Sequence, residues 1–134
     1  MREIKFRCWY DNQIQKVSNI DFRHKTINLF ASDIIKIEDG ILMQYTGLKD
    51  KNGVEIYEGD IIDIHQTVNG YNQFVVEYDD YKFSARYYNS KTKEIKGWYN
   101  YSLDELFEIN EYEKEIEVIG NIYETKGDDN NANS

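Results

Sequence analysis

The stretch QYTGLKDKNGVEIYEGDIIDI, residues 44–64, decides the fold because it combines three glycines, an Asn-Gly pair and an alternating apolar run. Gly47 permits a bend, and Gly59 marks a second break. Asn52 and Gly53 are the pair favoured in two-residue type I′ turns, where both positions need positive φ. These residues predict strands that are joined by tight turns.

Alternation outside this stretch predicts further strands with one apolar and one polar face. The runs lie at residues 4–8, 60–65, 81–88 and 113–119. Gly120 breaks or bulges the last run, and residues 102–105 match a capping box that would begin one short helix. We expect a mainly β fold, either a partly open antiparallel barrel or a strongly twisted sheet, with one or two short helices.

The length of 134 residues suits one domain with a single core. We assign residues 1–124 to that β domain and expect residues 125–134, which are polar, to be a disordered C-terminal tail. Residues 18–40 receive no assignment. With a single cysteine, Cys8, and no apolar run of membrane-spanning length, the sequence predicts a cytoplasmic protein.

The net charge of −9 is spread unevenly along the chain. Residues 1–30 hold six Lys/Arg and three Asp/Glu, whereas residues 91–134 hold five and eleven. A basic end and an acidic end favour contact between copies of the chain, although a solvated surface explains the same pattern. Binding to bulk phosphate is disfavoured at this charge.

No arrangement of residues in the sequence indicates catalysis. Asp60, Asp63 and His65 come closest to a metal cluster, but on one strand Asp60 points away from the other two, so we expect no metal. Cys8 lies on an apolar strand face and is expected to be buried. The glycines at 47, 53 and 59 lack the setting of a phosphate loop. We therefore predict neither an enzyme nor a cofactor.

Two charged or aromatic strands are candidates for an interaction surface. The strand at 81–88 could stack on bases while its cations contact phosphates. The acidic row at 113–117 could imitate a phosphate backbone or meet the basic N-terminal strand of another copy. A core strand and a charged, protected edge are the plainer interpretations. The candidate residues are Lys82, Arg86, Tyr88, Glu113, Glu115 and Glu117.

Three blocks of the chain resemble the signature blocks of the YopX family of phage and prophage proteins. They are REIKFRCW at residues 2–9, LMQYTGLKDKNGVEIYEGDI at 42–61 and EVIGNIYE at 117–124. The resemblance implies a mainly β, barrel-like fold and self-association, and it implies no enzyme activity. Cys8 stands where the family often has alanine. Residues 65–112 resemble no known block, so a specific site may be sought there.

Two functions follow as hypotheses. The first is a non-enzymatic accessory protein that self-associates and binds a host or phage protein in the infected bacterial cell. The alternative is a protein linked to nucleic acid, either through single-strand binding by residues 81–88 or through mimicry of DNA by the acidic C-terminal strand. The sequence does not identify the partner or the biological role.

Overall fold

The computed structural model describes residues 3–30, 33–79, 81–108 and 114–124, without the side chains of residues 97–100. The described residues form strands and two short helical segments with assigned bounds. The strands are β1 (Phe6–Tyr10), β2 (Gln13–Asp21), β3 (Thr26–Leu29), β4 (Ile34–Lys36), β5 (Ile41–Lys49), β6 (Glu55–Tyr57), β7 (Asp60–Val68), β8 (Tyr71–Asp79), β9 (Lys82–Asn89), β10 (Glu94–Ser102) and β11 (Glu117–Asn121). The helices are η1 (Ile37–Asp39) and α1 (Leu103–Glu108).

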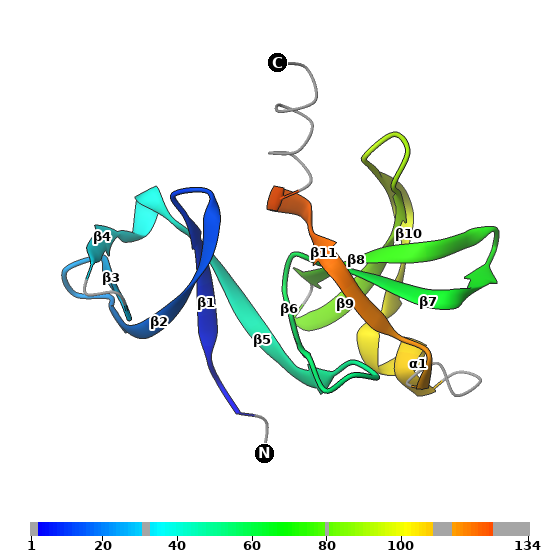
Figure 1. Cartoon of the computed structure of the whole chain (residues 1–134), viewed down its shortest axis with the longest axis horizontal. Helices are drawn as coiled ribbons and strands as arrows, with labels where there is room; N and C mark the ends of the chain where they lie inside the picture. Colours follow the sequence, from blue (N-terminus) through cyan, green and yellow to red (C-terminus); the bar gives the residue numbers. More distant parts are fainter. Residues whose placement is uncertain (1–2, 31–32, 80, 109–113, 125–134) are drawn as a thin grey trace.

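The strands divide between two antiparallel sheets that lie side by side along the long axis (Figure 1). The first sheet has the order β4-β3-β2-β1-β5-β6, and the second has the order β10-β9-β8-β7-β11. The mainly β class with short helices is confirmed. Within the described residues neither sheet closes into a barrel, because its outermost strands do not pair with each other.

β5 connects the two halves of the molecule. It pairs with β1 at its beginning and with β6 at its end, where the register shifts between Tyr45 and Lys49. Gly47, with φ of 88°, lies within that irregularity. Figure 1 shows the strand running from the first sheet toward the second. Its neighbour β6 places Ile56 in the core of the second half.

The core of the first half is small. Cys8, Ile27, Leu29 and Ile35 pack together beneath the strands, and Cys8 is fully buried, as its place on an apolar face predicted. Gly40 lets the chain pass close to this core. A Cβ atom there would lie 2.6 Å from the Cys8 sulfur. The thiol is therefore part of a packed interior.

The core of the second half is larger and rich in aromatic rings. It joins β6, β7, β8 and β9 to the helix α1, which contributes Leu103, Leu106 and Phe107. The hydroxyl of Tyr87 lies 3.0 Å from that of Tyr101 and accepts a bond from the amide of Asn69. Tyrosines thus fill this core while their polar ends remain hydrogen-bonded.

The strand within residues 81–88 differs from the alternating strand that the sequence predicted. β9 begins at Lys82, so Tyr81 belongs to the preceding turn and is exposed, although the alternation placed it with the core side chains. Ser84, expected on the polar face, is fully buried. Both faces of β9 are partly buried, so the half-buried strand expected from the alternation is wrong, and the alternation did not show where the strand begins.

The loop after β5 also differs from the expectation. Asn52 does not have positive φ, so the loop is not a two-residue type I′ turn around Asn52 and Gly53. Asp50 closes it instead. Its carboxylate accepts hydrogen bonds from the backbone N–H groups of Asn52, Val54 and Val118, at 2.8–2.9 Å. This buried carboxylate therefore holds the β5–β6 loop against β11.

We predict that Asp50→Ala lowers the free energy of unfolding by about 2–4 kcal/mol, because several backbone donors lose their acceptor. Urea denaturation followed by circular dichroism measures this value. Asp33→Ala is the matched control, since Asp33 is exposed beside β4. Equal stability of the two variants would contradict the role given to Asp50.

Candidate interaction site

A buried ion pair joins the two sheets. Arg7 on β1 donates from Nη2 to Oδ1 of Asp60 on β7, and the Asp60 side chain is 2% exposed. The other carboxylate oxygen accepts the N–H of Tyr57 at 2.8 Å. The Arg7 guanidinium also lies over the Tyr57 ring, 4.5 Å from its centroid. The two ions therefore fix β1 against the start of β7.

The same contacts assign a structural role to Asp60. Burial raises the pKa of its carboxyl, and the charge of Arg7 and the N–H of Tyr57 oppose that rise. The carboxylate is enclosed by Arg7 and the backbone of the β6–β7 turn. Asp60 consequently does not join Asp63 and His65, in agreement with the opposite strand faces expected from the sequence.

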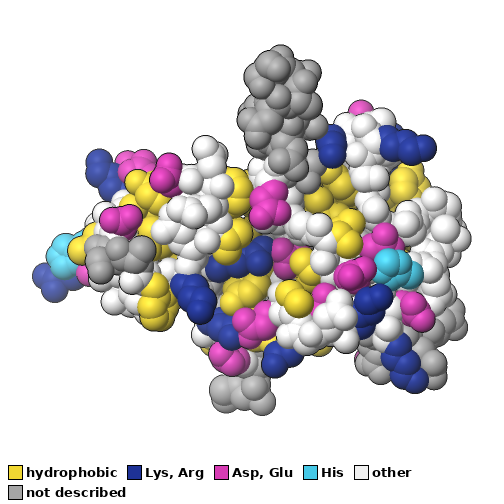
Figure 2. Space-filling view, in the orientation of Figure 1, with side chains coloured by type: hydrophobic (Ala, Val, Ile, Leu, Met, Phe, Trp, Pro, Cys, Tyr) yellow, Lys and Arg dark blue, Asp and Glu magenta, His cyan; other side chains and the backbone are white. Residues whose placement is uncertain are grey.

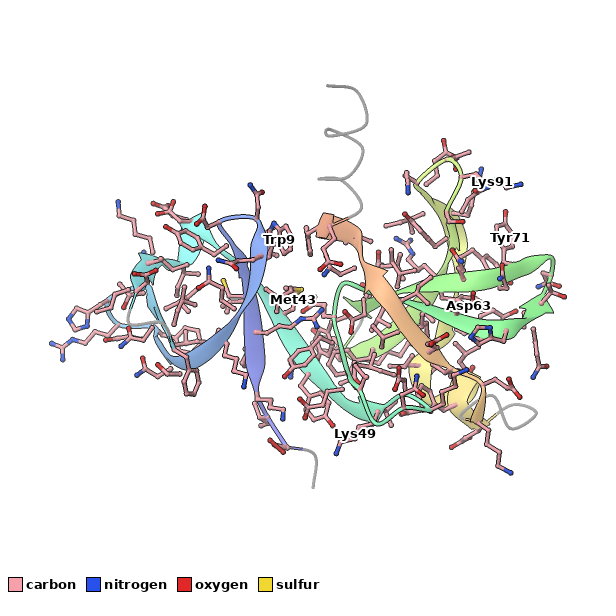
Figure 3. The ribbon with its side chains drawn as sticks, in the orientation of Figure 1. Trp9, Met43, Lys49, Asp63, Tyr71 and Lys91 are labelled. Atoms are coloured by element: carbon pink, nitrogen blue, oxygen red, sulfur yellow. The ribbon has the colours of Figure 1, made fainter. Side chains whose placement is uncertain are left out.

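Apolar side chains continue this inter-sheet interface. The rings of Trp9 and Tyr123 stack with centroids 6.2 Å apart, and Met43 packs with Tyr57 beside them. Figure 3 shows Trp9 and Met43 between the two sheets. Gly59 is required here because its φ is 90° and a Cβ atom would lie 3.2–3.3 Å from Tyr123 and Met43.

A second polar cluster lies on β7 and β11. His65 has φ of 56°, and its Nε2 lies 2.9 Å from a carboxylate oxygen of Glu117. Its backbone N–H donates to Asp63, which is directly opposite Glu117 in the register. In the described part of the chain no group of three or more His, Cys, Asp and Glu could hold a metal ion. Glu117 is thus engaged with a histidine of its own sheet.

The register places four of the candidate surface residues on one side of the second sheet. Alternate positions along β9 hold Lys82, Arg86 and Tyr88, so their side chains point to the same face. Glu117 of β11 pairs directly with Asp63 of β7 and lies on that face too. Lys82 is exposed, and Arg86 pairs with Glu77 at 3.3 Å.

Tyr88 requires a correction, because it is 5% exposed and packs on Val75, Ile61 and Ile122, so it offers no ring to a partner. Glu115 is exposed, and Glu113 lies outside the described residues.

A pocket of about 410 Å³ lies where the β8–β9 turn meets the end of β5 and the start of α1. We call it the aromatic pocket; it is lined by Thr46, Gly47, Leu48, Tyr78, Tyr81, Lys82, Phe83, Leu103 and Asp104. Tyr81 is 95% exposed, and Tyr78 packs edge-on against Phe83 with centroids 4.9 Å apart.

Sequence reasoning missed the aromatic pocket, because it assigned Tyr81 to the core. The Asp79-Asp80 turn signal before Tyr81 was the available indication that this residue could lie outside the strand.

The opposite half of the molecule presents a basic turn. Residues 22–25, between β2 and β3, read Phe-Arg-His-Lys and are all exposed, with Phe22 at 76%. Asp21 shapes the turn by accepting the backbone N–H of His24 at 3.0 Å. Figure 2 shows Lys, Arg and His side chains at the outer tip of this half. The β2–β3 turn therefore combines an exposed ring with positive charge.

The geometry defines a class of protein: a pair of small antiparallel sheets, with β5 running from the first toward the second, that are fixed together by a buried ion pair. A family model described as YopX protein matches residues 2–127, and the chain belongs to the YopX family.

The structure is similar to the crystal structure of protein EF1440 from Enterococcus faecalis, with a TM-score of 0.62 and 23% identity over 94% of this chain and 97% of that one. At that identity the similarity concerns the fold alone. No curated protein matches the chain in sequence. Among the described residues no helix is long and apolar enough to cross a membrane.

Glu58 lies next to the inter-sheet interface and supplies a test of it. Its side chain accepts the N–H of Gln44 at 3.3 Å, and burial raises the pKa of its carboxyl, with a further contribution from Glu77. A folded-state pKa above the unfolded value means that the unfolded chain ionises first as pH rises. Ionisation of Glu58 therefore disfavours the folded state as pH rises above its ordinary pKa.

We predict that Glu58→Gln becomes more stable relative to the wild type as pH is raised from about 4 to 7. Urea denaturation at several pH values measures this difference. Glu38→Gln is the control, since Glu38 is exposed in η1. The same pH dependence in both variants would show that Glu58 is not buried as described.

Proposed function

We propose that this YopX protein is a non-enzymatic accessory protein that self-associates and binds other proteins in the infected bacterial cell. The observation that carries the proposal is the exposure of large apolar side chains at turns and edges. Tyr81 is 95% exposed, Phe22 76%, and Phe30 and Ile34 67% each. Contiguous exposed apolar patches rimmed by polar residues are typical of surfaces that contact other proteins.

The polar clusters support a role in binding rather than catalysis. Arg7 and Asp60 hold the sheets together, and Asp50 closes a loop. His65 and Glu117 contact each other across neighbouring strands. Each of these groups stabilises the fold, and none of them lines the aromatic pocket.

The exposed surface favours a protein partner over nucleic acid. Single-strand binding by the 81–88 strand would require several rings open to stacking. The rings of β9, Phe83, Tyr87 and Tyr88, are each less than 10% exposed, which leaves Tyr81 of the preceding turn as the one open ring among residues 81–88. Of the acidic residues proposed to imitate DNA, Glu117 already contacts His65.

We predict that the weight-average mass from light scattering rises above the 16.0 kDa of one chain as concentration increases. A tagged copy should also retain a specific protein from lysate of infected host cells. A mass of one chain at every concentration, together with no retained partner, would contradict the proposal. A shift of labelled single-stranded DNA at low salt would favour the alternative instead.

A further inference from the structure

We propose that self-association is head-to-tail: the β2–β3 turn of one copy inserts Phe22 into the aromatic pocket of a second copy. The inference rests on the proposed self-association and specifies the two surfaces that meet. The surfaces lie in different halves of the chain, because Phe22 follows β2 of the first sheet and Tyr81 precedes β9 of the second.

The apolar parts of the two surfaces are complementary. The Phe22 side chain projects into solvent, with 76% of its surface exposed. The aromatic pocket presents Tyr78 and Tyr81, which are 44% and 95% exposed, and the half-buried side chain of Leu48. A ring that enters between other rings removes apolar surface of both copies from water and adds edge-to-face contacts.

The backbone at Tyr81 is consistent with a binding role. This residue has φ of 66°, which is uncommon for a bulky side chain. Asparagine or glycine would fit the turn at lower cost, so the tyrosine is not explained by the turn itself. The conformation directs a large, nearly fully exposed ring to the rim of the aromatic pocket.

The charges of the two surfaces also match. The ring of Phe22 is followed by Arg23 and Lys25, while His24 between them pairs with Asp21 at 2.7 Å. The aromatic pocket includes Asp104, and the exposed acids Asp79 and Glu105 adjoin its lining residues in the sequence. Lys82 supplies one opposing positive charge.

The same imbalance extends over the two halves of the chain. Residues 1–57 contain nine Lys/Arg and eight Asp/Glu, whereas residues 58–134 contain seven and seventeen. This difference in charge favours the approach of unlike halves and disfavours contact between two acidic halves.

Because the two surfaces differ, two copies cannot satisfy both of them in one symmetric contact. A bound pair still presents one unoccupied turn and one unoccupied pocket, so association continues into larger species or closes as a ring. This property distinguishes the proposal from a symmetric dimer. It also makes the two surfaces separable by mutation.

The test uses two variants of the full chain, Phe22→Ser and Tyr81→Asn, studied by sedimentation velocity at low salt. Asparagine suits the positive φ at position 81. We expect each variant alone to associate more than about tenfold more weakly than the wild type. An equimolar mixture should form a species of two chains, because each variant supplies the surface that the other lacks.

Two matched controls lie outside both surfaces. Ile4→Ser removes an exposed aliphatic group from the first half, and Ile119→Ser removes one from the second. Both should associate as the wild type does, and circular dichroism should show all four variants folded. Wild-type association should also weaken as salt is added, because part of the attraction is between exposed charges.

The possible failures are distinguishable. If the wild type associates but the mixture of Phe22→Ser and Tyr81→Asn stays monomeric, the copies meet through other surfaces and this inference is wrong, while the proposed self-association stands. If the wild type is monomeric at every concentration, both fail. Undiminished association of either folded variant alone also overturns the head-to-tail contact.

Discussion

The buried ion pair between Arg7 and Asp60 is the interaction on which the arrangement of the two sheets depends. Removing either charge from water costs several kcal/mol, and the attraction between the ions offsets this cost only when both are present and hydrogen-bonded. The N–H of Tyr57 and the ring beneath the guanidinium supply the additional contacts. The Met43 sulfur lies 3.7 Å from Arg7 Nη2, and Met43 belongs to an apolar cluster against which Trp9 and Tyr123 pack. The first core, which is small, is thereby attached to the larger second one.

This attachment bears on how the molecule can interact. The exposed ring of Phe22 and the aromatic pocket belong to different halves, so their relative positions depend on the inter-sheet interface and on the connecting strand β5. A rigid connection would repeat the same geometry at each added copy and give assemblies of defined shape. A loose connection would allow the same two surfaces to meet without a regular arrangement.

Much of the local structure could be predicted from the sequence, and most of the long-range structure could not. Alternation located the strands near 4–8 and 60–65, and it placed Cys8 in a core, because side-chain direction along a strand is a local property. Tyr81 was misassigned because alternation does not mark the first residue of a strand. The contacts of Asp50 and Asp60 were not predicted, because their partners Val118 and Arg7 are distant in sequence. The aromatic pocket also escaped prediction, as three separate segments line it.

The most direct test of the central claim is a double-mutant cycle with Arg7→Met, Asp60→Asn and the combined variant, using urea denaturation of the full chain at pH 7. Each single substitution leaves one buried ion without its partner and should lower the free energy of unfolding by about 3–5 kcal/mol. The combined variant should lose less than the sum of the two losses, by at least about 2 kcal/mol. Additive losses would contradict the account, because they would mean that Arg7 and Asp60 stabilise the protein independently and that something else holds the two sheets together.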